Sequence, residues 1–412
     1  MYARLPGALC RRLGAAGLLL AIASPVLAQP EEDPRATARL RLGPFYVTPT
    51  LTIGNVGVDT NVFNQAGEGK QDFTAAVRPG AEAWLLFARR AALRTSGSLG
   101  LVYFHTYASE RSVDPDLSMR PEIYLHRVTL FAEGRLYATR ERPNFEIDAR
   151  SRRTGRGALV GADVRVFRRL VVRLTAAEQQ TRFDADAVFF GTHLRDVLDR
   201  NERSAALALR YRWSPLTTFV ASGEAETHRF LHSPERNADS ARFVGGVELR
   251  PRALVSGTAF LGVRRFIGLS DLLPDFQGVV ASVGVGCTLL GATRVGFSAD
   301  RDVSYSFERQ QPYFVREGYG LTVRQALGRR FDILVGLQRA TYTYRDLVAS
   351  GLVRPRRPRV DVIRNLDLSL GFRPRADVRV GIGGAYWERV SETALFRNYN
   401  GLRLGLSASY GF

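Results

Sequence analysis

The chain has 412 residues, of which 45% are hydrophobic and 24% charged, and its formal net charge is +18. The hydrophobic share is too high for a disordered chain and supplies enough apolar surface for an extensive buried region. A mean hydropathy of −0.12 excludes a bundle of transmembrane helices, which would need repeated apolar runs of about 20 residues. Lys70 is the only lysine, so the positive charge is almost entirely arginine and favours anions as partners without naming one.

Residues 1–28 have the organisation of a secretory signal peptide. Three arginines precede an apolar stretch, residues 13–23, and the small residue Ala28 ends the segment. The stretch is short for an N-terminal membrane anchor, so we interpret it as a signal that is cleaved after Ala28. Cleavage would remove the three arginines and lower the formal charge from +18 to +15. Cys287 would then be the single cysteine, which excludes an intrachain disulfide.

The rest of the sequence predicts a short leader followed by one domain. Residues 29–43 are expected to form a polar periplasmic leader, and no linker or composition break divides residues 44–412. In this domain apolar and polar residues alternate over stretches of about 10 to 15 residues. The last stretch, residues 402–412, carries leucine, alanine, tyrosine and phenylalanine at even positions and arginine, glycine and serine at odd positions. A β-strand places these two sets on opposite faces.

The connections between these stretches are of two kinds. Short turns are expected at Arg89–Arg90, His126–Arg127, Arg168–Arg169, Ser214–Pro215, Pro251–Arg252, Gly291–Ala292, Gly328–Arg329 and Pro374–Arg375. Longer polar connections are expected at Asn64–Gln71, Ser109–Leu117, Arg142–Arg153, Asp184–Arg203, His232–Asp239 and Val348–Arg359. Short periplasmic turns that alternate with longer extracellular loops are typical of outer-membrane barrels, whose strands must close because unpaired backbone groups are not tolerated in lipid.

The turns predict an all-β fold, a single closed antiparallel transmembrane β-barrel. Two strands for each short turn, with the first and last strands added, give about 18 strands. The alternative is about 16, if residues 119–138 have been divided wrongly. An even number places both chain ends in the periplasm.

Two parts of the sequence carry a resemblance. The terminal strand, with Tyr410 and Phe412, resembles the signal read by the barrel assembly machinery of the outer membrane. The segments 45–53, 59–63 and 77–80 resemble the outer-membrane β-barrel porin family that is often associated with exopolysaccharide loci in Proteobacteria. The resemblance implies a location in the outer membrane of a Gram-negative bacterium and a role as a pore or in polymer export.

Arginine recurs on the polar face of the predicted strands, which would line the lumen. The lumen-lining candidates for anion contact are Arg78, Arg94, Arg165, Arg173, Arg210, Arg212, Arg242, Arg250, Arg264, Arg294, Arg316, Arg324, Arg373, Arg379 and Arg403. Arginine rings favour anions, and a barrel of this size is wide enough for a water-filled channel. We therefore expect a porin-like channel for anionic solutes, or for export of an acidic exopolysaccharide. The alternative for each arginine is a cross-strand pair with an inward acid, which would only brace the wall.

Other functions are less well supported. An occluded structural or assembly barrel without transport activity is the main alternative to a channel. The long connection Asp184–Arg203 is expected to be a surface loop facing outside, although it could fold inward. The arginine-rich segment 353–359 is a candidate for contact with lipopolysaccharide, and the outer-membrane lipid is the expected surrounding. An outer-membrane barrel enzyme is a more remote alternative, because the five histidines are scattered and form no catalytic or metal-binding pattern; no enzyme activity, metal or cofactor is expected. The secretory signal argues against a nucleic-acid partner.

Overall fold

The computed structural model describes residues 38–87, 90–250, 254–348, 358–392 and 394–411. The predicted signal peptide, most of the predicted leader and Phe412 lie outside these residues. In the described ranges no helix has the length and apolar character needed to cross a membrane. The single α-helix found there, α2 (Leu194–Leu198), has five residues.

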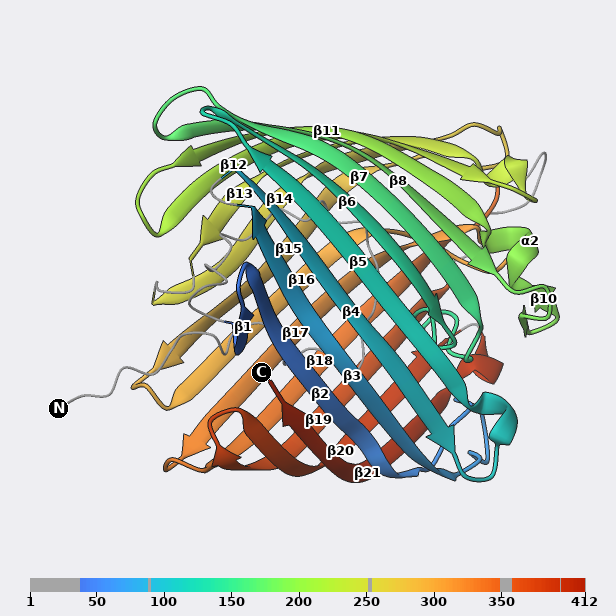
Figure 1. Cartoon of the computed structure of the whole chain (residues 1–412). Coiled ribbons are helices and arrows are strands. Elements are labelled where there is room, and N and C mark those ends of the chain that lie inside the picture. The colour runs from blue at the N-terminus through green and yellow to red at the C-terminus, as the bar shows by residue number, and fades with distance from the viewer. Residues whose placement is uncertain (1–37, 88–89, 251–253, 349–357, 393, 412) are drawn as a thin grey trace.

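Eighteen long strands form one closed antiparallel barrel (Figure 1). In chain order the barrel strands are β2 (Phe45–Asp59), β3 (Asp72–Phe87), β4 (Ala91–Phe104), β5 (Ser112–Tyr124), β6 (Val128–Thr139), β7 (Arg153–Arg165), β8 (Leu170–Phe183), β11 (Arg200–Arg212), β12 (Thr217–Phe230), β13 (Ala238–Leu249), β14 (Val255–Gly268), β15 (Phe276–Leu289), β16 (Thr293–Tyr305), β17 (Tyr313–Leu327), β18 (Phe331–Arg345), β19 (Val360–Arg375), β20 (Val378–Ser391) and β21 (Tyr399–Tyr410). Each strand pairs with the next, and β2 pairs with β21 to close the barrel. The predicted fold class and the count of 18 are confirmed.

Strand β21 shows how the sequence alternation produces two faces. Leu402, Leu404 and Leu406 are 40%, 56% and 53% exposed, as expected for residues in an apolar band that faces lipid. Arg403 lies between them on the opposite face, where it pairs in register with Asp59 of β2. Because the sheet is closed, this second face lines the lumen.

The two ends of the barrel differ in the length of their connections. One end, which we call the short-turn end, has connections of two to five residues. The other, the long-loop end, has connections of seven to 16 residues. The turn at residues 125–127 separates β5 from β6 as two strands, so the barrel has 18 strands and not 16.

Some of the predicted connections need correction. The predicted connection Ser109–Leu117 is too long, because β5 begins at Ser112 despite its proline and acidic residues. The connections 269–275, 306–312 and 392–398 were not predicted.

A small hairpin precedes the barrel. The strand β1 (Leu40–Leu42) pairs with the start of β2, and Gly43 has a φ of 60° in the turn between them, a conformation that glycine adopts without strain. The last residues of the predicted leader are therefore part of the sheet. Arg39 forms an ion pair of 2.7 Å with Asp377 in the turn between β19 and β20, which holds this segment at the short-turn end.

Candidate functional site

The predicted lumen arginines lie where the strand register puts the inward face. Each occupies a position that alternates with the exposed apolar residues of its strand. The strand positions are Arg78 on β3, Arg94 on β4, Arg165 on β7, Arg173 on β8, Arg210 and Arg212 on β11, Arg242 on β13, Arg264 on β14, Arg294 on β16, Arg316 and Arg324 on β17, Arg373 on β19, Arg379 on β20 and Arg403 on β21, with Arg250 directly after β13.

Most of these arginines have a carboxylate partner. Arg173 donates from Nε and Nη2 to the two carboxylate oxygens of Asp163, at 2.6 and 2.5 Å. Arg210 lies 2.5 Å from Glu248. Such charge-assisted bonds connect different strands or residues of the wall and fix the orientation of the guanidinium groups. Ion pairs of this kind are found for eleven of the fifteen arginines within the described residues.

Strands β11 to β16 carry an ion-pair lattice in which three acids face two arginines. Asp302 lies 3.6 Å from Arg242 and 3.1 Å from Arg264. The same two arginines also pair with Glu224 and Glu226, at 2.7 and 3.1 Å. Since each of these five charges has an opposite neighbour, the main effect of the lattice is to brace the sheet.

The wall near the short-turn end is different, because arginine there outnumbers acid. On β7 to β20 the inward arginines within about six residues of the short turns form what we call the arginine belt: Arg165, Arg173, Arg210, Arg212, Arg250, Arg294, Arg324, Arg373 and Arg379. The inward acids at the same level are Asp163, Glu248 and Asp332, while Asp377, in the turn directly before β20, already pairs with Arg39. The remaining wall does not cancel this surplus, because the short-turn halves of β3 to β6 carry Arg94 and Arg120 against Glu82, Glu122 and Glu133.

The densest part of the belt surrounds Asp332 on β18. Its carboxylate lies 3.0 Å from Arg324, 3.0 Å from Arg373 and 2.9 Å from Arg379. Arg294 is directly opposite Arg324 in the strand register. One carboxylate thus faces three guanidinium groups, which leaves a net formal charge of +2 in this cluster.

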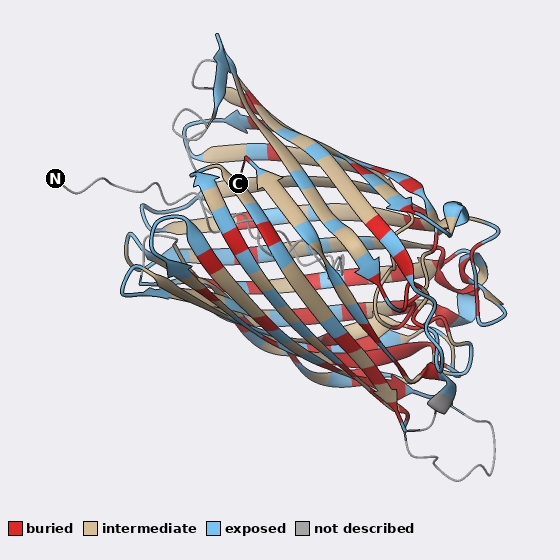
Figure 2. Cartoon of the chain, turned by 90° about the horizontal axis from the view of Figure 1, so that it is seen from below, coloured by how far each residue is buried: buried red, intermediate tan, exposed pale blue. Residues whose placement is uncertain are grey.

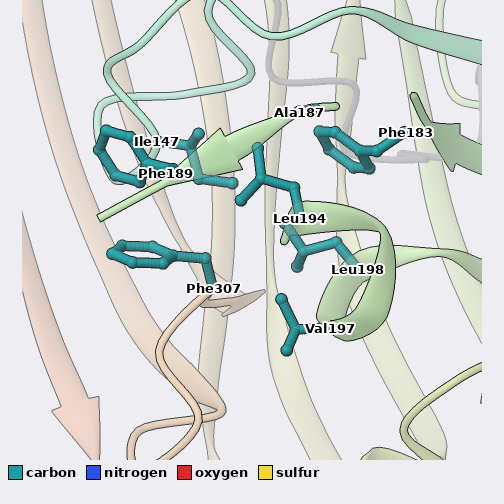
Figure 3. Packing of buried hydrophobic residues seen from close by; sticks show 8 residues of the cluster. All are labelled: Ile147, Phe183, Ala187, Phe189, Leu194, Val197, Leu198 and Phe307. Carbon is teal, nitrogen blue, oxygen red and sulfur yellow. The ribbon is translucent and has the colours of Figure 1, made fainter. Parts of the chain in front are cut away.

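At the long-loop end, segments from distant parts of the chain pack together. Figure 2 shows buried residues gathered in the connections at the end opposite the two termini. One apolar cluster joins Ile147 of the β6–β7 connection, Phe189 and α2 of the β8–β11 connection, and Phe307 of the β16–β17 connection (Figure 3). We call these three connections, residues 140–152, 184–199 and 306–312, the mouth layer.

The mouth layer overturns the expectation for the long connection Asp184–Arg203. A short helix does form there, but Leu194 and Val197 are 0% and 1% exposed, so the segment is not a free surface loop. The reason is that its apolar residues, spaced over α2 and the hairpin of β9 (Val188–Phe189) and β10 (Thr192–His193), find a partner in the β6–β7 connection. The strand β11 also begins at Arg200, within the predicted loop.

A buried ionic network anchors the mouth layer to the barrel wall. Asp148 of the β6–β7 connection lies 3.1 Å from Arg389 of β20 and 3.6 Å from Arg397 of the β20–β21 connection. Arg389 also pairs with Asp361 of β19 at 2.5 Å. The side chains of the four residues are at most 4% exposed. Because β6 and β20 are well separated around the barrel, residues 140–152 extend from one part of the rim to another.

Glu146 lies inside the same layer. Its carboxylate accepts hydrogen bonds from the Ser306 hydroxyl at 2.9 Å and from the Phe307 backbone N–H at 3.4 Å. Burial raises the pKa of Glu146 to about 7, although Arg397 and Arg389 act in the opposite direction. The mouth layer therefore contains one acid that titrates near neutral pH.

The sequence analysis missed this network. Arg389 has the same inward parity as the predicted Arg379, so the alternation could have identified it. Asp148, Glu146 and Arg397 lie in connections, where no periodicity indicates which way a side chain points. In the described residues no group of three or more histidine, cysteine or acidic side chains has a geometry suited to a metal ion.

Two of the predicted partner contacts fall partly outside the described residues. Tyr410 of the predicted assembly signal lies on the outward face of β21 and is 39% exposed, but Phe412 is not described. In the arginine-rich segment 353–359 only Pro358 and Arg359 are described, and Arg359 pairs with Asp361 at 2.7 Å instead of facing solvent. Contact with lipopolysaccharide and with the assembly machinery stays a prediction.

Comparison with solved structures finds many barrels with little sequence in common with this chain. OccK3 (OpdO) of Pseudomonas aeruginosa has a TM-score of 0.48 and 11% identity, over 88% of this chain and 95% of that chain. The siderophore receptor PirA of Pseudomonas aeruginosa has a TM-score of 0.41 and 10% identity, over 89% and 80%. The FrpB iron transporter of Neisseria meningitidis has a TM-score of 0.45 and 10% identity, over 84% and 63%. No curated protein matches the chain.

A family comparison is decisive, because it covers most of the sequence. The family model described as "Putative beta-barrel porin 2" matches residues 33–354. That range includes the barrel strands from β2 to β18, and the remaining strands complete the same closed sheet. The chain therefore belongs to the family Putative beta-barrel porin 2 and is a porin-like barrel of the outer membrane.

Proposed function

We propose that the protein is an outer-membrane channel that favours anionic solutes, acidic polysaccharides included. The observation that carries this proposal is the arginine belt, nine inward arginines against three acids on β7 to β20. Short turns face the periplasm in barrels of this class, so the belt lies at the periplasmic end of the lumen. Guanidinium groups stay charged at every physiological pH, so the surplus does not depend on titration.

The expected preference for anions has an electrostatic cause. A positive wall lowers the barrier for anions and raises it for cations, and the low-dielectric barrel around it strengthens the field in the lumen. The ion-pair lattice on β11 to β16 contributes little to this preference, because each of its charges already faces an opposite neighbour. Selectivity is thus expected to depend on the belt more than on the total number of lumen arginines.

The test is the reversal potential of the purified protein in a planar bilayer under a potassium chloride gradient. The wild type is expected to prefer chloride, and the triple variant with Arg165→Gln, Arg212→Gln and Arg250→Gln to lose part of that preference. Arg203→Gln is a matched control, because Arg203 is 69% exposed and alternates with the inward positions of β11. Cation preference in the wild type, or equal selectivity in the triple variant and the control, would overturn the proposal.

The mouth layer favours a second candidate, a barrel whose lumen is closed in its resting state and that acts in assembly or anchoring. Residues from three connections pack there around buried apolar and charged side chains. Single-channel recording distinguishes the two candidates. Stepwise conductance in the wild type supports the channel, whereas no conductance in the wild type, together with conductance in a variant with a weakened mouth layer, supports the closed barrel.

A further inference from the structure

The cluster around Asp332 contains more arginines than are needed to hold neighbouring strands together. Other ion-paired arginines of the wall meet one or two acids, as Arg173 meets Asp163 and Arg242 meets Glu224 and Asp302. Asp332 instead accepts a hydrogen bond of 3.0 Å from each of three arginines, Arg324, Arg373 and Arg379. A single ion pair between an arginine and Asp332 would already join two strands. Each additional guanidinium group repels the others, and one carboxylate does not cancel that repulsion.

The wall is also shaped to hold one of these guanidinium groups in place. The backbone at Gly371 of β19 and Gly381 of β20 runs directly beneath the guanidinium of Arg379, and a Cβ at Gly381 would lie 2.9 Å from its Nη1. At Gly371 a Cβ would overlap the guanidinium. Arg379 also donates to the Ser369 hydroxyl at 3.0 Å. Two glycines and a serine thus orient a planar donor group on the inward face.

We infer that Arg324, Arg373 and Arg379 form a binding site for an oxyanion, a phosphate or carboxylate group carried by the solute, with Asp332 as its resident counter-charge. The inference deepens the proposed anion channel and rests on it. Guanidinium groups donate pairs of parallel N–H bonds that match the oxygens of phosphate and carboxylate. The net charge of +2, together with Arg294 opposite Arg324, favours an anion that approaches from the lumen.

The role given to Asp332 has a consequence that bracing would not have. Its carboxylate competes with the solute for the same donors, so removing its charge while keeping its shape frees them. The variant Asp332→Asn is expected to bind an oxyanion more tightly than the wild type. A wall whose arginines serve only to hold strands together would gain no affinity from the loss of its central acid.

The probe is inorganic phosphate, titrated into the purified full chain in detergent and followed by isothermal titration calorimetry. Calorimetry measures binding whether or not the barrel conducts, so failure of the site and failure of the channel proposal are distinguishable. We expect Arg379→Gln and Arg373→Gln to weaken phosphate binding by about tenfold each and Asp332→Asn to strengthen it by a similar factor. Arg242→Gln is the matched control, because Arg242 belongs to the ion-pair lattice on β11 to β16, away from Asp332.

Each result of the calorimetry either supports or contradicts the binding site. Binding that weakens in the two arginine variants and persists in the control supports the site, even if Asp332→Asn fails to fold. Absence of phosphate binding in the wild type, or an equal loss in Arg242→Gln and Arg379→Gln, would overturn the inference. Weaker binding in a folded Asp332→Asn would overturn the role given to the acid.

Discussion

The buried contact of Asp148 offers the sharpest test of the mouth layer. The change Asp148→Asn keeps the shape of the side chain but removes the charge that faces Arg389 at 3.1 Å and Arg397 at 3.6 Å. Arg389 retains Asp361, whereas Arg397 loses the one acid with which it forms an ion pair in the described residues. Leaving a buried charge without its partner costs about 3 to 5 kcal/mol.

This loss of stability is expected to weaken the attachment of residues 140–152 without unfolding the barrel. The strands are held by continuous backbone pairing, but residues 140–152 depend on the contacts of Asp148, Glu146 and Ile147 for their position. A loss of about 3 kcal/mol would raise the population of the detached loop by about 100-fold. This segment contains arginines, so detachment exposes sites for trypsin.

The assay is limited trypsin digestion of the folded protein, with single-channel conductance as the second readout. Asp148→Asn is expected to be cleaved within residues 140–152 far faster than the wild type and to show a larger conductance. Asp239→Asn is the matched control, because Asp239 pairs with Arg229 at 2.7 Å while its side chain is 45% exposed, and exposed pairs contribute about 0 to 1 kcal/mol. Equal cleavage rates for the wild type and Asp148→Asn would refute the reasoning.

Three further predictions follow from the same structure. The folded mouth raises the pKa of Glu146 to about 7 from an ordinary value of 4.5, so protonation should tighten the mouth layer progressively as the pH falls from about 7 toward 4.5, and this gain is absent above about 7. Comparison of loop cleavage at pH 6 and pH 8 checks this, and Glu146→Gln should remove the difference. Leu194→Ala should destabilise the mouth layer by about 2 to 5 kcal/mol through the cavity left in its apolar cluster, and unchanged protease resistance would contradict that. Leu207→Arg, on the lipid face of β11, should cost about 2 to 4 kcal/mol in urea unfolding from lipid, whereas Ala206→Arg on the inward face should cost much less.

The barrel could be predicted from the sequence because period-two alternation is a local property. In β21 the side-chain types alone separate Leu404 from Arg403, and the same rule places the fifteen arginines on one face. The short turns could be counted because they interrupt that alternation at regular intervals. The beginnings of β5 and β11 are exceptions, because Asp114 and Pro115 in β5 and the charged residues at the start of β11 resemble loop sequence.

The mouth layer could not be predicted, because its contacts join residues far apart in the chain. Glu146 meets Ser306, and Asp148 meets Arg389, across separations of 160 and 241 residues. The partners of the arginines were equally hidden. Register puts Arg324 and Asp332 on one face, but only the assembled sheet shows that Arg373 and Arg379 converge on the same carboxylate.

The reversal potential of the wild-type protein tests the central claim most directly. Under a gradient of potassium chloride across a planar bilayer, the surplus of arginine in the belt predicts a potential whose sign corresponds to preferential chloride flow. The preference should weaken as ionic strength rises, because salt screens the charges that face the aqueous lumen. A potential of the opposite sign, corresponding to preferential potassium flow, would contradict the account.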